Sequence, residues 1–98
     1  MNKKENKPVI TVFTPTYNRQ KLLERAYASL CEQTSKDFIW QIVDDGSTDD
    51  TRKQVEKWQI ESDFEIRYVY QENGGKMRAH NRGVQLTETE LFVCLDSD

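Results

Sequence analysis

The feature that most constrains the fold is a regular alternation of strand-like and helix-like segments along the chain. Four runs rich in β-branched and aromatic residues predict strands at residues 8–14, 38–43, 64–70 and 91–95. The last of these is apolar throughout, which is typical of a strand buried on both faces. Strands that alternate with helices favour an α/β fold, with a mostly parallel, Rossmann-like sheet and helices on its faces.

The segments between the strands predict three helices. In the first, apolar side chains recur every three or four residues, and Asn18 stands where a helix cap is expected, after Pro15 has ended the first strand. The second helix is short and ends before Ser62, and the third covers residues 76–86, although Gly83 is a poor helix former. The apolar face of the first helix comprises Leu22, Leu23, Ala26, Tyr27 and Leu30.

The chain of 98 residues is long enough for one domain. We expect a polar N-terminal tail at residues 1–7 and a folded domain at residues 8–98. The tail is charged and precedes no apolar stretch of the signal-peptide kind. The longest uninterrupted apolar run, residues 91–95, is also far shorter than the about 20 residues of a membrane-spanning helix.

The charge and the cysteine content limit the classes of function that this chain can have. The 14 Lys and Arg against 17 Asp and Glu give a net charge of -3, which argues against a nucleic-acid partner. Residues 83–98 hold no Lys or Arg, so this acidic end suits a cation or no ligand at all. The two cysteines, Cys31 and Cys94, are too few for a disulfide framework. We expect both to be small apolar residues in a reducing, cytoplasmic compartment.

A polar cluster follows each predicted strand. These clusters lie at residues 15–18, 44–47, 73–76 and 96–98. The carboxyl ends of parallel strands meet at one edge of the sheet, and open α/β sheets bind their ligands there. The sequence therefore predicts a binding site at this edge.

The cluster after the second strand contains two adjacent aspartates. Neighbouring side chains at a strand end point in different directions, so one of Asp44 and Asp45 could bind a base or ribose while the other orders the loop. The alternative is a turn with a helix cap and no ligand. A calcium loop of the EF-hand kind is excluded, because Gly46 directly follows the two aspartates.

The cluster at the C-terminal end has the pattern of a metal site. Asp96 and Asp98 alternate with Ser97 directly after the apolar strand, and oxygen ligands suit Mg²⁺ or Mn²⁺ bound to phosphates. The alternative is a solvated turn.

The cluster after the third strand has the composition of an anion site. Asn73, Gly74 and Gly75 offer backbone N–H groups, and Lys76 adds a cation at the start of a predicted helix. The spacing does not match a Walker loop. An ordinary turn is the alternative, and His80 in the helix is then one residue of a solvated basic face.

Taken together, the clusters resemble the N-terminal, nucleotide-binding half of the family 2 glycosyltransferases, which have the GT-A fold. The resemblance covers residues 9–98. It rests on the motifs Thr14-Pro15-Thr16-Tyr17-Asn18-Arg19, Asp44-Asp45-Gly46-Ser47-Thr48-Asp49, Asn73-Gly74-Gly75-Lys76 followed by Ala79, Asn81 and Gly83, and Asp96-Ser97-Asp98 as the D-x-D motif.

This resemblance implies transfer of a sugar, with inversion, from a nucleoside diphosphate sugar to a glycan or lipid-linked acceptor, as in bacterial polysaccharide synthesis. A UDP-sugar is favoured by its frequency in the family. The implied metal is Mn²⁺ or Mg²⁺, held by Asp98 and Asp96. The nucleotide-sugar-binding residues implied are Pro15, Thr16, Tyr17, Asn18, Asp44, Asp45, Gly75, Lys76, Asn81 and Asp96.

Two features depart from the family pattern. His80 stands where many members carry arginine, and the catalytic base of the family is expected beyond residue 98. We therefore expect a piece of a longer enzyme, inactive alone and able to self-associate through uncovered surface, with any membrane attachment in other regions. The alternatives are a non-catalytic nucleotide-binding module and a sugar nucleotidyltransferase, although the latter calls for a Gly-rich, Arg-containing loop after the first strand.

Overall fold

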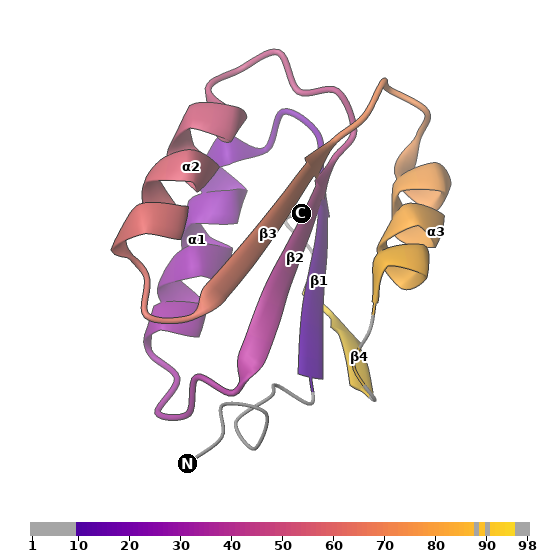
Figure 1. The fold of residues 1–98 in the computed structure, drawn as a ribbon. Helices are drawn as coiled ribbons and strands as arrows, with labels where there is room; N and C mark the ends of the chain where they lie inside the picture. Colours follow the sequence, from indigo (N-terminus) through magenta and orange to yellow (C-terminus); the bar gives the residue numbers. More distant parts are fainter. Residues whose placement is uncertain (1–9, 88, 90, 96–98) are drawn as a thin grey trace.

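The computed structural model describes residues 10–87, 89 and 91–95, so the predicted tail lies outside the described residues. Strands and helices alternate along the chain, as predicted (Figure 1). The elements are β1 (Ile10–Thr16), α1 (Gln20–Cys31), β2 (Phe38–Asp44), α2 (Thr51–Glu61), β3 (Glu65–Tyr70), α3 (Lys76–Leu86) and β4 (Leu91–Cys94).

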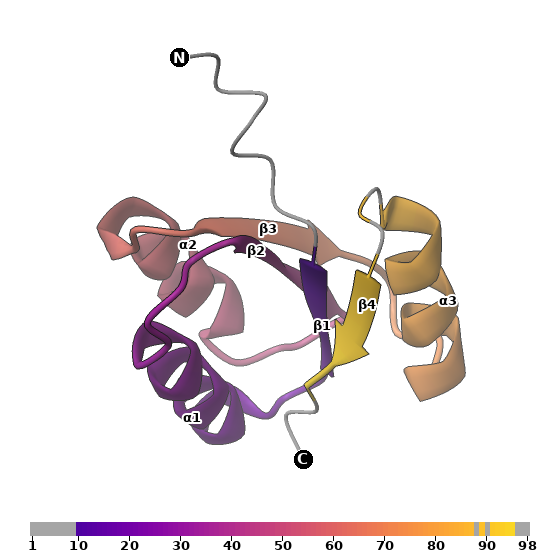
Figure 2. The same cartoon turned by 90° about the horizontal axis from the view of Figure 1, so that it is seen from below.

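The four strands form one parallel sheet in the order β3-β2-β1-β4. The chain moves outward from β1 through β2 to β3, and then returns to the other side of β1 to form β4. Parallel strands are joined by right-handed crossovers, so this reversal of direction places α3 on the face opposite to α1 and α2. Figures 1 and 2 show this arrangement, which confirms the predicted Rossmann-like sheet.

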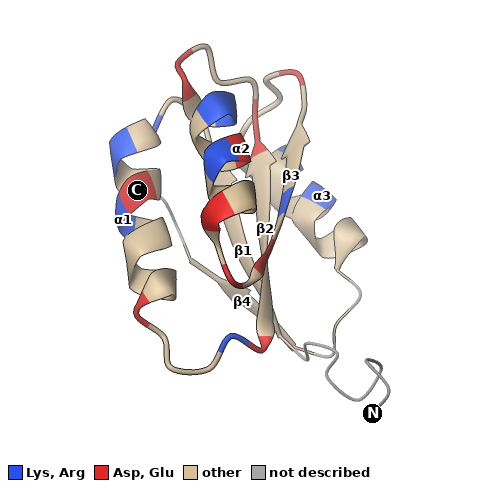
Figure 3. Cartoon of the chain, turned by 60° about the vertical axis from the view of Figure 1, so that its left-hand side comes forward, with Lys and Arg blue, Asp and Glu red and all other residues tan. Residues whose placement is uncertain are grey.

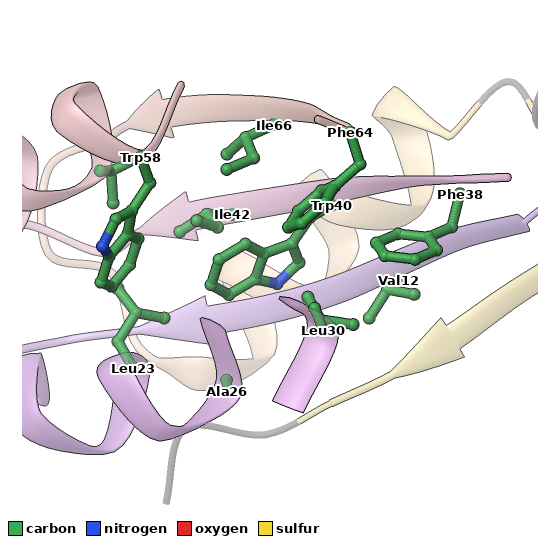
Figure 4. Close-up of a cluster of buried hydrophobic side chains, with 11 residues drawn as sticks. Val12, Leu23, Ala26, Leu30, Phe38, Trp40, Ile42, Trp58, Phe64 and Ile66 are labelled. Atoms are coloured by element: carbon green, nitrogen blue, oxygen red, sulfur yellow. The ribbon is translucent and has the colours of Figure 1, made fainter. Parts of the chain in front are cut away.

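The larger core lies between the sheet and the helices α1 and α2 (Figure 4). Its centre is a set of stacked rings, in which the Tyr27 and Trp58 centroids are 4.3 Å apart and the Trp40 ring is fully buried. The face that α1 buries carries Leu23, Ala26 and Leu30, which lie three or four residues apart as predicted. This packing fixes α1 and α2 against the sheet.

The smaller core lies under α3. Phe13 and Val43 are fully buried beneath Ala79 of this helix. A Cβ atom at Gly83 would lie 2.2 Å from Cε1 of Phe13, so only glycine allows α3 to approach β1 this closely. The glycine that weakened the helix prediction is therefore a packing requirement of that helix.

Two predictions about the first strand and helix are wrong. β1 does not end at Pro15 but runs to Thr16, and α1 begins at Gln20. In the described chain no side chain caps this helix, because the Asn18 carboxamide oxygen accepts a hydrogen bond from the Thr48 backbone N–H instead, at 2.8 Å. The polar side chain that looked like a local cap makes a long-range contact.

Burial of β4 and of the cysteines also differs from expectation. Leu91 and Val93 are 54% and 49% exposed, whereas the sequence predicted burial on both faces. An apolar sequence alone does not bury a strand, because burial also needs a layer of side chains packed over it. Among the described elements, α1 and α2 pack over β1, β2 and β3. Both Cys31 and Cys94 are free, but both are exposed, so neither packs in the core as a small apolar residue.

Candidate functional site

The loops after β1, β2 and β3 meet at the carboxyl edge of the sheet. The Asp45 N–H donates to the Thr16 carbonyl at 2.8 Å, which continues the strand pairing beyond the end of β2. The Asn18 N–H donates to Ser47 Oγ, also at 2.8 Å, and joins the first two loops. Asn18 adopts a φ of +50°, a conformation that asparagine tolerates better than most residues. The predicted convergence of polar clusters is thus present for these three loops.

Asp44 is fully buried and serves the structure of the loop. One carboxylate oxygen accepts a hydrogen bond from the Ser47 N–H at 2.8 Å, and the other accepts from the Tyr68 hydroxyl at 2.5 Å. Burial raises the pKa of the Tyr68 hydroxyl well above its usual range, and the neighbouring Asp44 carboxylate raises it further. The hydroxyl therefore stays a donor, and Asp44 points into the protein.

Asp45 points the other way, toward the loop between β3 and α3. Its Oδ1 accepts hydrogen bonds from Gln71 Nε2 and from the Gly74 N–H, both at 2.9 Å, and its Oδ2 accepts from the Gly75 N–H at 2.8 Å. Burial disfavours the charged form, but these bonds and the Arg78 charge outweigh it and lower the pKa of Asp45. An ionised Asp45 therefore holds the loop in place.

The divergent directions of Asp44 and Asp45 agree with the sequence prediction. Each carboxylate oxygen has more than one acceptor site, and in the described part of the chain Asp45 Oδ2 accepts a single hydrogen bond. Asp45 can consequently hold the loop and still accept a hydrogen bond from a ligand.

Glycine is required where these loops touch. Gly46 has a φ of +91°, and a Cβ atom there would lie 2.9 Å from the Asn73 backbone nitrogen. Gly75 has a φ of +96° at the start of α3, a conformation that residues with a Cβ rarely adopt. The two glycines bring the backbone N–H groups of the loop to Asp45.

Thr16 contributes a buried hydroxyl to the same edge. The residue is 3% exposed, and its Oγ1 has no hydrogen-bond partner among the described residues. Buried polar atoms nearly always have a partner, so this hydroxyl indicates a position for a ligand atom or a water. Next to it, Pro15 is buried and Tyr17 is 44% exposed.

The remaining predicted residues are not joined to this cluster by a described contact. Lys76 is the first residue of α3, but its side chain lies outside what the structure describes, and Asn81 is exposed on the same helix. His80 packs edge-on against Phe13, with ring centroids 5.6 Å apart, and its Nε2 lies 3.6 Å from Cys94 Sγ. His80 therefore faces the sheet.

Sequence reasoning missed Tyr68 and Gln71, which hold the two aspartates. The signal for Tyr68 was the alternation within residues 64–70, which places every second side chain on one face of the sheet. A shallow pocket of about 400 Å³ at the start of α1 was also not predicted, although Asn18, Arg19 and Asp49 belong to the motifs quoted above. It is lined by Asn18, Arg19, Gln20, Lys21, Leu22 and Asp49. Figure 3 shows acidic and basic residues side by side around this end of the molecule.

The predicted metal ligands, Asp96 and Asp98, lie outside the described residues. Within residues 10–87, 89 and 91–95, no group of three or more His, Cys, Asp or Glu side chains could hold a metal ion. The donor set of the D-x-D motif consists of oxygen atoms, which fits a hard divalent cation. The same described residues contain no helix that is long and apolar enough for a membrane span.

Comparison with known sequences places these features in a family. The profile described as "Glycosyl transferase family 2" matches residues 11–98. A validoxylamine A glucosyltransferase of Streptomyces hygroscopicus subsp. limoneus is 40% identical over 92% of this chain and 20% of its own length. A GalNAc(5)-diNAcBac-PP-undecaprenol beta-1,3-glucosyltransferase of Campylobacter jejuni is 37% identical over 93% of this chain and 30% of its own length.

Solved structures give the same result. A mannosyltransferase from Pyrobaculum calidifontis, in complex with GDP-Man and Mn²⁺, superposes with a TM-score of 0.83 at 31% identity, covering 94% of this chain and 28% of the other. TarS 1–349 of S. aureus in complex with UDP gives a TM-score of 0.81, also at 31% identity, covering 91% of this chain and 27% of the other. The chain thus spans about a fifth to a third of the length of these relatives. Because the family profile matches almost the whole chain, the chain belongs to glycosyl transferase family 2.

Proposed function

We propose that this chain forms the donor-binding part of an inverting glycosyltransferase, which transfers a sugar from a nucleoside diphosphate sugar to a glycan or lipid-linked acceptor. The observation that carries the proposal is the arrangement around Asp45. The backbone N–H of Asp45 binds the end of β1, whereas its carboxylate holds the loop before α3 and, among the described residues, keeps acceptor capacity for a ligand. Family membership supplies the reaction class.

The described groups suit the parts of a nucleotide. Asp45 Oδ2 and the Thr16 hydroxyl, which has no partner among the described residues, can bind the N–H and oxygen groups of a base or ribose. The exposed Tyr17 ring can flank a base. The start of α3 has a positive electrostatic end that favours phosphate oxygens. UDP is favoured as the nucleotide, and complexes of a structural relative with UDP and with UDP-GlcNAc support this choice.

Asp98 and Asp96 would hold Mn²⁺ or Mg²⁺ in this proposal, because their carboxylates follow β4 directly in the sequence. The ion, when bound, neutralises charge that develops on the leaving diphosphate. The mannosyltransferase complex with Mn²⁺ supports a divalent cation in this fold.

Inversion needs a base within hydrogen-bond reach of the acceptor hydroxyl. We propose that a carboxylate from outside residues 1–98 performs this step, and that the acceptor is a glycan or lipid-linked glycan. The name of the Campylobacter relative, which contains an undecaprenol-linked glycan, supports that class of acceptor. We also propose a cytoplasmic location, with which the two free cysteines agree.

Calorimetric titration of UDP into the full-length protein tests this proposal. UDP should bind in Mn²⁺, and binding should weaken in EDTA and in Asp98→Ala. Thr16→Val should weaken binding under both conditions, because it removes a hydroxyl that no other described residue binds and keeps the shape of the side chain. Absence of binding for both UDP and GDP would refute the proposed function, and binding without turnover of UDP-sugars would favour a non-catalytic module.

A further inference from the structure

A chain of hydrogen bonds runs from β2 through β1 to Leu95, the residue that follows β4. Trp40 Nε1 donates to Thr14 Oγ1 at 2.9 Å, and Thr14 Oγ1 donates to the Leu95 carbonyl oxygen at 2.6 Å. Trp40 and Thr14 are both 0% exposed. These groups lie outside the cluster around Asp45 and are not among the groups proposed to bind the nucleotide.

The direction of this relay is fixed by the chemistry of its members. An indole N–H can only donate and a carbonyl oxygen can only accept, whereas a hydroxyl has one hydrogen and can do both. The Thr14 hydroxyl oxygen therefore accepts the Trp40 N–H, and the hydroxyl hydrogen is donated to the Leu95 carbonyl. The hydroxyl cannot turn away without breaking both bonds.

The Leu95 carbonyl needs this donor because of Pro15. In β1, the Phe13 carbonyl accepts from the Leu95 N–H at 2.8 Å, whereas the Thr16 carbonyl accepts from Asp45. The backbone N–H and carbonyl groups of the odd-numbered β1 residues thus point toward β4. The next backbone donor to the Leu95 carbonyl would be the nitrogen of residue 15. Proline has no N–H. The Thr14 hydroxyl takes the place of the missing ladder donor.

The peptide that this bond orients is the one that leads into the D-x-D motif. Leu95 directly precedes Asp96 in the sequence. Because a peptide group is planar, the orientation of the Leu95 carbonyl also sets the orientation of the following nitrogen. The Leu95 N–H and carbonyl are both bonded to β1, so the backbone of this residue is held in place on both sides of its Cα.

We propose that Thr14 is a positioning residue, whose buried hydroxyl replaces the donor that Pro15 lacks and fixes the Leu95 carbonyl, one residue before the Asp96-Ser97-Asp98 motif in the sequence. This inference rests on the proposed function, because it assumes that the segment binds a divalent cation with the nucleotide. Trp40 is the supporting partner that holds the hydroxyl in its donating orientation.

The matched variants are Thr14→Val, which has the same shape without the hydroxyl, and Thr14→Ser, which keeps it. Thr11→Val is the control, since it removes another buried β1 hydroxyl, bonded to Thr89 at 2.7 Å. We expect Thr14→Val to weaken Mn²⁺-dependent UDP binding by the full-length protein about 10-fold, the lower end for residues that support metal ligands. Thr14→Ser keeps this hydroxyl and Thr11→Val leaves it in place, so both variants should bind UDP as tightly as the unsubstituted protein.

Nuclear magnetic resonance gives a readout that does not depend on binding. Thr14→Val should shift the Trp40 indole N–H and the Leu95 carbonyl-carbon resonances, and Thr14→Ser should not. Adding Pro15→Ala to Thr14→Val restores a backbone N–H at the ladder position. The Leu95 resonance should then move back, and this double variant also serves if Thr14→Val alone folds poorly.

The outcomes separate this inference from the function on which it rests. If the unsubstituted protein binds no nucleoside diphosphate, the proposed function fails and the role of Thr14 fails with it. If that protein binds UDP with Mn²⁺ while Thr14→Val binds equally well despite a shifted indole resonance, the positioning role alone is refuted. Equal weakening by Thr14→Val and Thr11→Val, or equal weakening in EDTA and in Mn²⁺, would also overturn it, because the hydroxyl would then serve stability only.

Discussion

Replacing Asp45 by asparagine should release the loop before α3 and destabilise the fold. The carboxylate accepts three hydrogen bonds, from Gln71 and from the backbone of Gly74 and Gly75. Asparagine keeps one acceptor oxygen and replaces the other with an NH₂ group that donates. In either orientation of the amide, at least one of the three donors then faces another donor.

The size of the effect follows from this mismatch. A buried donor without a partner costs about 1–3 kcal/mol, and a hydrogen bond to a charged group contributes about 1.5–3 kcal/mol. Asp45 is 4% exposed, but Gly74 and Gly75 are exposed residues, so water can replace part of what their N–H groups lose. We expect Asp45→Asn to lower the free energy of unfolding by about 1–3 kcal/mol near neutral pH.

The effect should depend on pH in one direction. Although burial alone would raise the pKa of Asp45, the hydrogen bonds and the Arg78 charge lower it below the ordinary value of 3.8. The folded state therefore binds the proton less tightly than the unfolded state. Ionised Asp45 stabilises the fold above pH 3.8, and this contribution is lost as the pH falls through the lower pKa of the folded state. The difference between Asp45→Asn and the unsubstituted protein should shrink accordingly.

Urea unfolding followed by tryptophan fluorescence measures both quantities, because Trp40 and Trp58 are buried in the larger core. Asp63→Asn is a matched control at an exposed aspartate in the turn before β3. The reasoning is refuted if Asp45→Asn unfolds at the same urea concentration as the unsubstituted protein at about pH 7, or if the difference is the same at about pH 3.

Two further substitutions test the packing and the helix ends. Gly83→Ala should lower the free energy of unfolding by about 1–3 kcal/mol, because the new methyl group overlaps Phe13, even though alanine favours helices. Gln85→Ala, exposed on the same helix, should have little effect, and a stabilised Gly83→Ala would contradict this account of α3. Lys36→Met should cost about 1 kcal/mol, because the Lys36 ammonium donates to carbonyl oxygens at the end of α1. Lys57→Met is the exposed control on α2, and equal melting temperatures for the two methionine variants would contradict this capping role.

The sequence alone predicted the succession of elements because each depends on local periodicity. The three helices and four strands were expected within a few residues of their observed bounds. The strand order was beyond reach, since the reversal that brings β4 beside β1 depends on contacts between distant residues. Convergence of the polar loops could nevertheless be predicted, because any parallel sheet brings its carboxyl ends to one edge.

The prediction failed where a residue serves a distant partner instead of its neighbours. Asn18 has the right chemistry for a helix cap, yet its oxygen binds Thr48 across the loop. Pro15 stops most strands, but its missing N–H is tolerated here because Thr14 supplies the donor. Leu91 is apolar without being buried in the described chain. For Asn18 and Pro15, a contact beyond the range of the local pattern decides the outcome, whereas Leu91 stays exposed because composition alone does not bury a strand.

The adjacent aspartates show how one edge of the sheet can be both rigid and open to a ligand. Asp44 uses both carboxylate oxygens on its own chain, so its substitution should affect stability first. Asp45 holds the neighbouring loop but keeps acceptor capacity, and Thr16 beside it presents a hydroxyl without a partner in the described chain. The atoms that hold the loops in place are therefore different from the atoms that stay available to a ligand at this edge of the sheet. A variant that weakens nucleotide binding without lowering stability is accordingly expected at Thr16, and not at Asp44.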